Sequence, residues 1–382
     1  MKTARFTENA RFPEFLQGGK PMPKEILSYV PHELSYASYE ERPLAADEIR
    51  VRVEYAAPKH GSELHGWRSD PNAPARDFDL ESKCFIESPR DPDAKTVPGV
   101  FRPGNMWVGR VTETGSAVKE FTVGSRAAGY GCLKETQTVK VGLRSEPGFG
   151  FCEDVLPVPD GMSWKAAVCY DPAQFAMSGV RDSMIRLGDV CLVTGLGAVG
   201  MLAAQMAKLQ GAGLVVVSDP IELRRRIALE NGADVALDPL HDDVGLTVKR
   251  LSGNRGADAV IETSGSYPGL QTALRAAAYG ARIAVVGWFQ PCRGSFDLGL
   301  EAHMNNATIF FSRACSEPNP DNPRWNWERI RLECWRLLSS GALDCERIVD
   351  PVVPFEEAAG VYLDVVDRHP EKSVKMGVSF EE

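Results

Sequence analysis

Three glycines and one carboxylate in residues 191–219, CLVTGLGAVGMLAAQMAKLQGAGLVVVSD, are spaced as a dinucleotide-binding site requires. Gly195 permits a tight turn, Gly197 lets the backbone approach a pyrophosphate, and Gly200 lets a helix pack closely on the preceding strand. Asp219 follows the turn by about 20 residues, where a carboxylate can accept hydrogen bonds from ribose hydroxyls. The unit therefore predicts a dinucleotide site with contacts from Gly195, Leu196, Gly197, Ala198, Val199, Gly200 and Asp219.

The same unit bears on which dinucleotide binds. The Asp219 carboxylate would repel a 2′-phosphate, so the sequence favours NAD over NADP. Arg224, Arg225 and Arg226 lie shortly downstream and could serve such a phosphate, although a solvated helix face is the commoner role of an arginine run. NAD is therefore the expected cofactor, and Arg224 stays a candidate contact.

This chemistry needs two strands and a helix to hold it. Residues 190–194 are short, apolar and β-branched, which is typical of a buried parallel strand, and ligands bind at the carboxyl ends of such strands. Residues 198–209 are rich in alanine and predict a helix whose free N–H groups and positive dipole end face the phosphates. Residues 214–218 predict the next strand, which places Asp219 at its end.

Composition and charge restrict the class of protein. A chain of 382 residues is too long for one ordinary core, and 43% hydrophobic and 25% charged residues are typical of a globular protein. A net charge of −9 argues against nucleic-acid and anionic-membrane partners. We find no membrane span or leader pattern, and nine scattered cysteines are typical of thiols in a reducing compartment. We therefore expect a cytoplasmic protein with a small-molecule partner.

Hydrophobic periodicity divides the chain into three parts. Alternation at 48–55 and short strands with glycine turns at 108–131 predict a β-rich opening region. From about residue 171, helices alternate with continuous apolar strands, which predicts a parallel sheet covered on both faces. From about residue 316, an amphipathic helix and a final strand predict a tail that returns to the first domain.

Several motifs together resemble the medium-chain dehydrogenase/reductase superfamily, in particular its alcohol, polyol and threonine dehydrogenase branch. They include HGSELHG at 60–66, GNMWVGRVTETGS at 104–116, the glycine unit, GADAVIETSG at 256–265 and GALDCERIVDPVVPFEEAAGVY at 341–362. The resemblance implies an α/β plus β-barrel fold, with an active site in the cleft between two domains. These are a GroES-like catalytic domain and a central Rossmann domain, a doubly wound parallel sheet, with bounds 1–174 and 317–382 for the first and 175–316 for the second. It also implies a homodimer or homotetramer, formed through the strand near 309–312.

Zinc-dependent members of that superfamily carry metal ligands at positions that this chain fills differently. The Cys position is His60, the His and Glu positions are Asn105 and Met106, and the last position is Asp171. Zinc takes about four ligands from thiolate, imidazole and carboxylate groups, so only His60 and Asp171 remain as weak candidates. We therefore expect no catalytic zinc.

Two further stretches depart from the superfamily pattern. The stretch that would hold a structural zinc has only Cys132 and Cys152, so no such site is expected. An insertion before Gly104 carries many charges and prolines and predicts a surface loop. Such a loop is either ordered near the site entrance or a plain solvated excursion.

Without zinc, protein groups must hold the substrate oxygen and remove its proton. In resembling enzymes the residue at the Ser62 position passes the proton through the cofactor ribose toward the His65 position, so the resemblance predicts a relay there. Lys59 and His60 stand at the former metal position. A cation there would hold the substrate oxygen, whereas neutral His60 would act as the general base.

Two neighbouring positions and the second nucleotide loop supply the remaining candidates. Asp171 is expected to orient His60 or keep it charged, and Asn105 is equally suited to contacts with substrate or backbone. The resemblance implies further cofactor contacts at Ser264, Gly265, Val286, Gly287, Trp288 and Arg313.

The predicted activity is NAD-dependent interconversion of a secondary alcohol and a ketone, on a polyol, sugar derivative or similar small polar substrate. Two alternatives stay open. A lyase, epimerase or eliminase would use tightly bound NAD transiently and release no net NADH. A noncatalytic nucleotide-binding relative would bind the cofactor and turn over no substrate.

Overall fold

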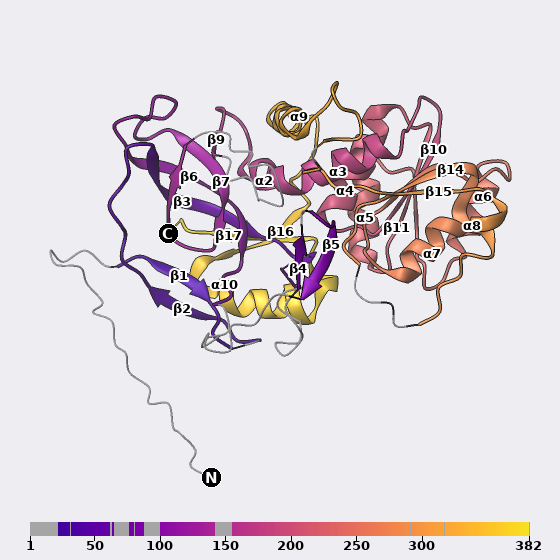
Figure 1. Cartoon of the computed structure of the whole chain (residues 1–382). Coiled ribbons are helices and arrows are strands. Elements are labelled where there is room, and N and C mark those ends of the chain that lie inside the picture. The colour runs from indigo at the N-terminus through magenta and orange to yellow at the C-terminus, as the bar shows by residue number, and fades with distance from the viewer. Residues whose placement is uncertain are drawn as a thin grey trace, which may run out of the picture.

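The computed structural model describes residues 22–30, 32–61, 63–64, 76–79, 81–87, 100–141, 155–289, 292, 294–316 and 318–381. These residues build two sheet-based domains that lie side by side, one mainly antiparallel and one wholly parallel (Figure 1). The predicted fold class, a parallel-sheet Rossmann domain with a separate β-rich domain, is confirmed. Within the described stretches, no helix is long and apolar enough to cross a membrane.

The parallel sheet has six strands in the order β12-β11-β10-β13-β14-β15. The chain runs outward from β10 to β12, then crosses back and continues from β13 on the other side of β10. In such sheets, ligands bind in the crevice at the carboxyl ends of the strands where the order reverses, which here are β10 and β13. The strands are β10 (Val190–Thr194), β11 (Leu214–Ser218), β12 (Val235–Leu237), β13 (Ala257–Glu262), β14 (Ala277–Val285) and β15 (Thr308–Phe311).

Helices cover both faces of this sheet, which explains why its central strands are apolar throughout. All five residues of β10 are buried. The helix that follows the glycine turn begins at Ala198, as the sequence predicts, and ends one residue later than predicted, at Gln210. The helices of this region are α3 (Tyr170–Asp182), α4 (Ala198–Gln210), α5 (Glu222–Glu230), α6 (Val244–Leu251), α7 (Tyr267–Ala276) and α8 (Glu301–Met304).

The other large sheet joins strands from both ends of the chain. Its order is β16-β17-β3-β6-β7-β9, and β8 also pairs with β3. The last strand, β17, pairs with β3 through Val378 opposite Ala56, so the tail lies against the end of β3. The strands are β3 (Glu48–Pro58), β6 (Gly104–Thr114), β7 (Arg126–Cys132), β8 (Thr136–Lys140), β9 (Val155–Pro157), β16 (Val349–Pro354) and β17 (Lys375–Ser379).

Two hairpins and several short helices complete the described structure. The hairpin of β4 (Arg76–Asp79) and β5 (Cys84–Glu87) lies in the insertion where the sequence predicts a surface loop. Phe78 and Phe85 pack edge to face with centroids 5.2 Å apart, and this contact favours paired strands over a plain loop. The other elements are β1 (Lys24–Leu27), β2 (Ser35–Ser38), α2 (Trp164–Val168), α9 (Trp327–Ser339), α10 (Phe355–Val361), the π-helix η1 (Tyr362–Arg368) and the 3-10 helix η2 (Pro370–Lys372).

One hydrophobic core continues from the antiparallel sheet into the parallel sheet. It includes Met106 of β6, Ala173 of α3 and Val193 of β10. Because α3 is packed against both sheets, polar residues on its first turns are held between the two domains. Asp171 and Gln174 are three positions apart on α3, and therefore share one face of the helix.

Candidate active site

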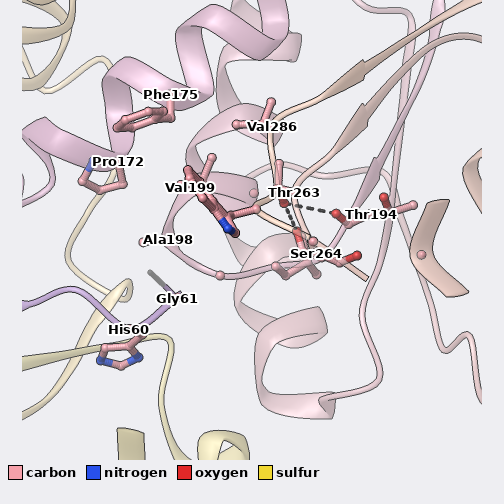
Figure 2. Close-up of a pocket in the computed structure, with 18 of the residues that line it drawn as sticks. His60, Gly61, Pro172, Phe175, Thr194, Ala198, Val199, Thr263, Ser264 and Val286 are labelled. Atoms are coloured by element: carbon pink, nitrogen blue, oxygen red, sulfur yellow. Dashed lines mark hydrogen bonds between the residues drawn. The ribbon is translucent and has the colours of Figure 1, made fainter. Parts of the chain in front are cut away.

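A cavity of about 1350 Å³ is lined by residues of both domains. In Figure 2, His60 lies at one end of the drawn residues and Ser264 lies well away from it. The predicted site residues that line the cavity are Lys59, His60, Asn105, Asp171, Gly195, Leu196, Gly197, Ala198, Val199, Gly200, Asp219, Arg224, Ser264, Gly265, Val286, Gly287, Trp288 and Arg313. Ser62 and His65 lie outside the described residues.

The glycine turn has the geometry that close backbone packing demands. Gly195 has a φ angle of +86°, a conformation that glycine adopts without steric cost. A Cβ atom on Gly200 would lie 1.9 Å from the Gly195 carbonyl oxygen, so only glycine lets α4 pack this closely. Thr263 Oγ1 donates a hydrogen bond to the same carbonyl at 2.7 Å and ties the turn to the end of β13 (Figure 2). A Cβ atom on Gly197 would meet nothing within 4 Å, so the backbone there faces open space.

A buried carboxylate holds the second loop of the cavity in place. Glu262, at the end of β13, accepts hydrogen bonds from the Ser264 N–H at 2.8 Å and the Gly265 N–H at 3.3 Å. The Ser264 hydroxyl also donates to it. Burial raises the pKa of Glu262 to about 7, against the opposing effect of these hydrogen bonds. Glu262 is therefore a positioning residue for Ser264 and Gly265.

Asp219 is tied to the glycine turn and to the tail of the chain. Its carboxylate accepts hydrogen bonds from the Leu196 N–H at 2.7 Å and the Ile221 N–H at 2.8 Å. Arg224 Nη1 lies 4.0 Å from Asp219 Oδ2. The Arg224 guanidinium also donates to the carbonyl oxygens of Pro370, at 3.0 Å, and Ser373, at 3.1 Å. Arg224, the candidate phosphate contact from the sequence, thus also joins the parallel-sheet domain to the C-terminal tail.

The described residues fit a dinucleotide. No side chain caps the N-terminus of α4 at Gly197, so its N–H groups and positive dipole end suit a pyrophosphate. Two cations on the cavity wall, Arg224 and Lys375, suit the same charge. Asp219 follows β11 directly, where its carboxylate could accept hydrogen bonds from ribose hydroxyls.

Lys59 and Asp171 form an ammonium–carboxylate pair on the cavity wall. Lys59 Nζ is 3.0 Å from Asp171 Oδ2, and Asn105 Nδ2 donates to the same oxygen at 3.1 Å. The Lys59 ammonium also lies 5.0 Å from the centroid of the Phe175 ring. Asp171 is nearly buried, with 6% of its side chain exposed, whereas Lys59 is more open to the cavity at 27%. The cavity wall therefore carries an ammonium group that is held by a nearly buried carboxylate.

The Nε2 atom of His60 accepts a hydrogen bond from the backbone. The Met376 N–H donates to His60 Nε2 at 3.0 Å, so a neutral imidazole here carries its hydrogen on Nδ1. Burial, with smaller effects of the nearby Lys375 and Arg224 cations, lowers the pKa of His60 to about 3. The sequence led us to expect Asp171 to orient His60, but its carboxylate is instead engaged with Lys59 and Asn105. His60 is thus a neutral donor.

The depressed pKa of His60 predicts a pH dependence of stability. Between pH 6.5 and 3 the unfolded chain binds a proton that the folded protein does not, so folding loses stability as pH falls. In His60→Gln, the Gln side chain can still accept from the Met376 N–H. Between pH 7 and pH 5, the free energy of unfolding should fall by about 1 to 2 kcal/mol less in this variant than in the wild type. Urea unfolding at both pH values measures the difference. Equal losses in the two proteins would contradict this reading of His60.

The donor set does not suit zinc. The His60 Nε2 lone pair already accepts a hydrogen bond, and the Asp171 carboxylate is paired with an ammonium group. Asn105 presents its amide N–H to that carboxylate, and an amide nitrogen is not a zinc ligand. Across the part of the chain that the structure describes, no group of three or more His, Cys, Asp or Glu side chains could hold a metal ion.

Several cavity or supporting residues were not singled out from the sequence. Glu63 accepts hydrogen bonds from the Gly104 N–H at 2.6 Å and the Tyr362 hydroxyl at 3.1 Å, and burial raises its pKa to about 8. The Lys375 ammonium donates to the Pro58 carbonyl oxygen at 2.9 Å, and burial lowers its pKa. No local pattern marks such residues, because each acquires its role from segments distant in the chain. The cavity also includes Tyr130, Gln174 and Trp327.

Comparison with known proteins agrees with this architecture. A family model described as zinc-binding dehydrogenase matches residues 198–327. D-guloside 3-dehydrogenase of Escherichia coli (strain K12) is 46% identical over 357 residues, which cover 94% of this chain and 100% of that protein. The 2R,3R-butanediol dehydrogenase of Bacillus subtilis has the same fold, with a TM-score of 0.70 at 18% identity, over 94% of this chain and 100% of that one.

The fold, together with 46% identity to a named dehydrogenase, defines an oxidoreductase with a Rossmann domain beside a β-rich domain. The chain belongs to the medium-chain dehydrogenase/reductase superfamily. A short chain alcohol dehydrogenase of Escherichia coli CFT073, solved with NADH, has the same fold, with a TM-score of 0.68 at 20% identity. That match covers 94% of this chain and 99% of that one. Another solved neighbour is bound to NADP.

Proposed function

We propose that this protein is an NAD-dependent dehydrogenase that interconverts a secondary hydroxyl and a ketone on a sugar derivative. The observation that carries the proposal is the Lys59–Asp171 pair, which lines the same cavity as the glycine turn. The 46% identity to D-guloside 3-dehydrogenase over nearly the whole chain supports a glycoside as the substrate. A small cyclic polyol is the same chemical class and a reasonable second substrate.

The cofactor contacts follow from the cavity wall. The N-terminus of α4, with Arg224 and Lys375, would hold the pyrophosphate, and Asp219 would hold the adenosine ribose. The negative charge of Asp219 disfavours a 2′-phosphate, which supports NAD over NADP. Held there, NAD would supply the hydride acceptor for the carbon that carries the hydroxyl.

Lys59 would hold the oxygen of the reacting hydroxyl. Its ammonium group donates a hydrogen bond to that oxygen and stabilises the negative charge that develops as the hydroxyl proton leaves. Asp171 pairs with the ammonium group, and Asn105 holds Asp171 by donating to the same carboxylate oxygen. His60 supplies a neutral N–H at Nδ1 and is not the proton acceptor. The proton leaves through Ser62 and His65, the relay that the resemblance predicts.

We also propose that the protein acts without zinc, in the cytoplasm, as a homodimer or homotetramer. Zinc-free action is supported because His60 Nε2 already accepts a hydrogen bond and the Asp171 carboxylate is already paired with Lys59. The last strand of the parallel sheet, β15, supports an oligomer, because it is an edge strand and its Phe311 is 74% exposed. The predicted domain bounds, 1–174 with 317–382 and 175–316, belong to the same proposal.

One experiment tests the function and the metal requirement together. The purified protein, dialysed against EDTA, is mixed with a methyl D-guloside and either NAD or NADP, and reduced cofactor is followed by absorbance. We expect turnover that chelation does not diminish and that is faster with NAD. Activity that is lost with EDTA and restored by Zn²⁺ would contradict the zinc-free mechanism. Substrate conversion without net NADH release would instead favour the NAD-retaining alternative.

A further inference from the structure

Lys59 and His60 are neighbours in the chain, but their side chains contact different elements. Lys59 pairs with Asp171 of α3 at 3.0 Å. The His60 imidazole instead accepts a hydrogen bond from the Met376 N–H of β17, also at 3.0 Å. His60 therefore lines the same cavity without taking part in the Lys59–Asp171 pair.

Two cations lie beside His60. Lys375, the first residue of β17, donates from its ammonium group to the Pro58 carbonyl oxygen at 2.9 Å, two residues before His60. Arg224 donates to the Ser373 carbonyl oxygen at 3.1 Å, two residues before Lys375. Both cations are close enough to lower the pKa of His60, although burial is the larger cause. One imidazole and two cations thus gather on one part of the cavity wall.

Asp219 connects this group of side chains to the glycine turn. Its carboxylate accepts a hydrogen bond from the Leu196 N–H at 2.7 Å and lies 4.0 Å from Arg224 Nη1. Leu196 directly precedes Gly197, where α4 begins without a side-chain cap. The first N–H groups of a helix attract an anion, as the two cations do. An anion at this part of the wall would therefore meet donors from both domains.

Two of these donors lack an anionic or hydrogen-bond partner that they could use. In the part of the chain that the structure describes, the Lys375 ammonium forms no ion pair, although the residue is only 3% exposed. A buried charge is costly without a counter-charge, and an anionic ligand would offset that cost. Because His60 Nε2 is an acceptor, the neutral imidazole carries its hydrogen on Nδ1. Nδ1 has no hydrogen-bond partner among the described residues.

We propose that His60 binds the pyrophosphate of the dinucleotide, by donating its Nδ1 hydrogen to a phosphate oxygen beside Arg224 and Lys375. His60 is then a cofactor ligand, and Lys59 alone of the two neighbours contacts the reacting hydroxyl. The inference rests on the proposed function and deepens it, because it moves a candidate catalytic residue to the cofactor site. A neutral donor suits this place, since Arg224 and Lys375 already supply positive charge.

The test measures the binding of cofactor fragments and needs no turnover. ADP-ribose contains the pyrophosphate, and adenosine lacks it. His60→Met removes the N–H donor but keeps a sulfur atom that can accept weakly from the Met376 N–H. The Kd of ADP-ribose should rise about 10- to 100-fold, as expected for the loss of one hydrogen bond to a charged group, and that of adenosine should stay within about twofold. Calorimetric titration measures both Kd values.

Two variants serve as controls. In His60→Gln, the amide oxygen can accept from the Met376 N–H and the NH2 group can donate to a phosphate, so most of the ADP-ribose affinity should return. A merely structural role for His60 would not make this affinity depend on a donor. His303 is exposed on α8 and does not line the cavity, so His303→Met should leave both Kd values unchanged.

A second measurement uses the wild-type protein and so does not depend on the folding of a variant. With histidine labelled by nitrogen-15, ADP-ribose should shift the His60 Nδ1–H resonance and slow its exchange with water, whereas adenosine should do neither. Comparison with the spectrum of His60→Gln identifies the resonance.

The possible outcomes separate this inference from the proposed function. If the wild type binds NADH, but His60→Met keeps wild-type affinity for ADP-ribose, the inference is wrong and the function stands. Equal losses for ADP-ribose and adenosine would also overturn it, because they indicate a general disturbance of the site. If the wild type binds neither NADH nor ADP-ribose, the proposed function and the inference both fail. A loss confined to ligands with the pyrophosphate, and reversed in His60→Gln, supports the inference.

Discussion

Lys59→Met is expected to lower kcat by about 10³-fold while leaving the Kd for NADH within about twofold of the wild type. The expectation follows from the geometry, since the Lys59 ammonium lines the cavity and is oriented by Asp171 at 3.0 Å. Methionine keeps the length of the side chain and removes its charge, so the developing negative charge on the substrate oxygen loses its partner. Steady-state turnover with a methyl D-guloside measures kcat, and a fluorescence titration measures NADH binding.

Two matched variants sharpen this prediction. Lys165→Met removes a lysine that donates to the Glu346 carbonyl oxygen and does not line the cavity, so kcat should not change. Lys59→Arg keeps the positive charge at a longer reach and should retain part of the activity. A fall in kcat of less than about tenfold in Lys59→Met would show that Lys59 does not hold the reacting oxygen, because one well-placed group contributes about 10²-fold or more.

Gly200→Ala is expected to raise the Kd for NADH by about 10²-fold, since a displacement of about 1 Å at a site can have this effect. The added Cβ would stand 1.9 Å from the Gly195 carbonyl oxygen and 2.7 Å from Thr263 Oγ1, so the turn and α4 must move apart. The same overpacking should destabilise the fold by about 1–3 kcal/mol. Fluorescence titration and thermal unfolding report the two effects.

Two other glycines act as controls for Gly200. A Cβ on Gly360, in the interior of α10, meets nothing within 4 Å, so Gly360→Ala should leave NADH binding unchanged. A Cβ on Gly197 also meets no protein atom within 4 Å, so Gly197→Ala should fold as the wild type does. It should nevertheless bind NADH more weakly, because the methyl group enters the space where the backbone faces the cofactor. Wild-type affinity in Gly200→Ala would refute the packing argument.

The nucleotide-binding unit is the part of the fold that the sequence predicted most closely. Strands β10 and β11 have the predicted bounds, and α4 begins at the predicted residue. Their determinants are local: a run of buried β-branched residues makes the strand, and glycines permit the turn. The insertion before β6 was less well predicted. Within it the structure shows the β4–β5 hairpin, in which Phe78 packs on Phe85 across the two strands. Local composition does not reveal this contact, so the hairpin was not predicted.

The sequence identified the candidate catalytic residues, but it did not predict which of them contact one another. Lys59, His60, Asn105 and Asp171 all line one cavity. The sequence predicted that Asp171 orients His60 or keeps it charged, and the structure pairs Asp171 with Lys59 instead. His60 instead accepts from a backbone N–H 316 residues away in the chain. Which side chain meets which carboxylate depends on how β17 lies against the end of β3, and no local pattern encodes that.

From the sequence by itself we predicted a dinucleotide site, its first and last residues, and the replacement of the usual zinc ligands. These properties depend on residue type and short spacing along one segment. Only the tertiary structure decided which of these side chains contact one another on the cavity wall. The Lys59–Asp171 pair joins distant segments. So do the hydrogen bonds that join Gln174 to the Tyr130 hydroxyl, 44 residues away, and to Trp327 Nε1, 153 residues away. Such contacts form only when both sheets pack on α3, because no single segment can shield these polar groups from water.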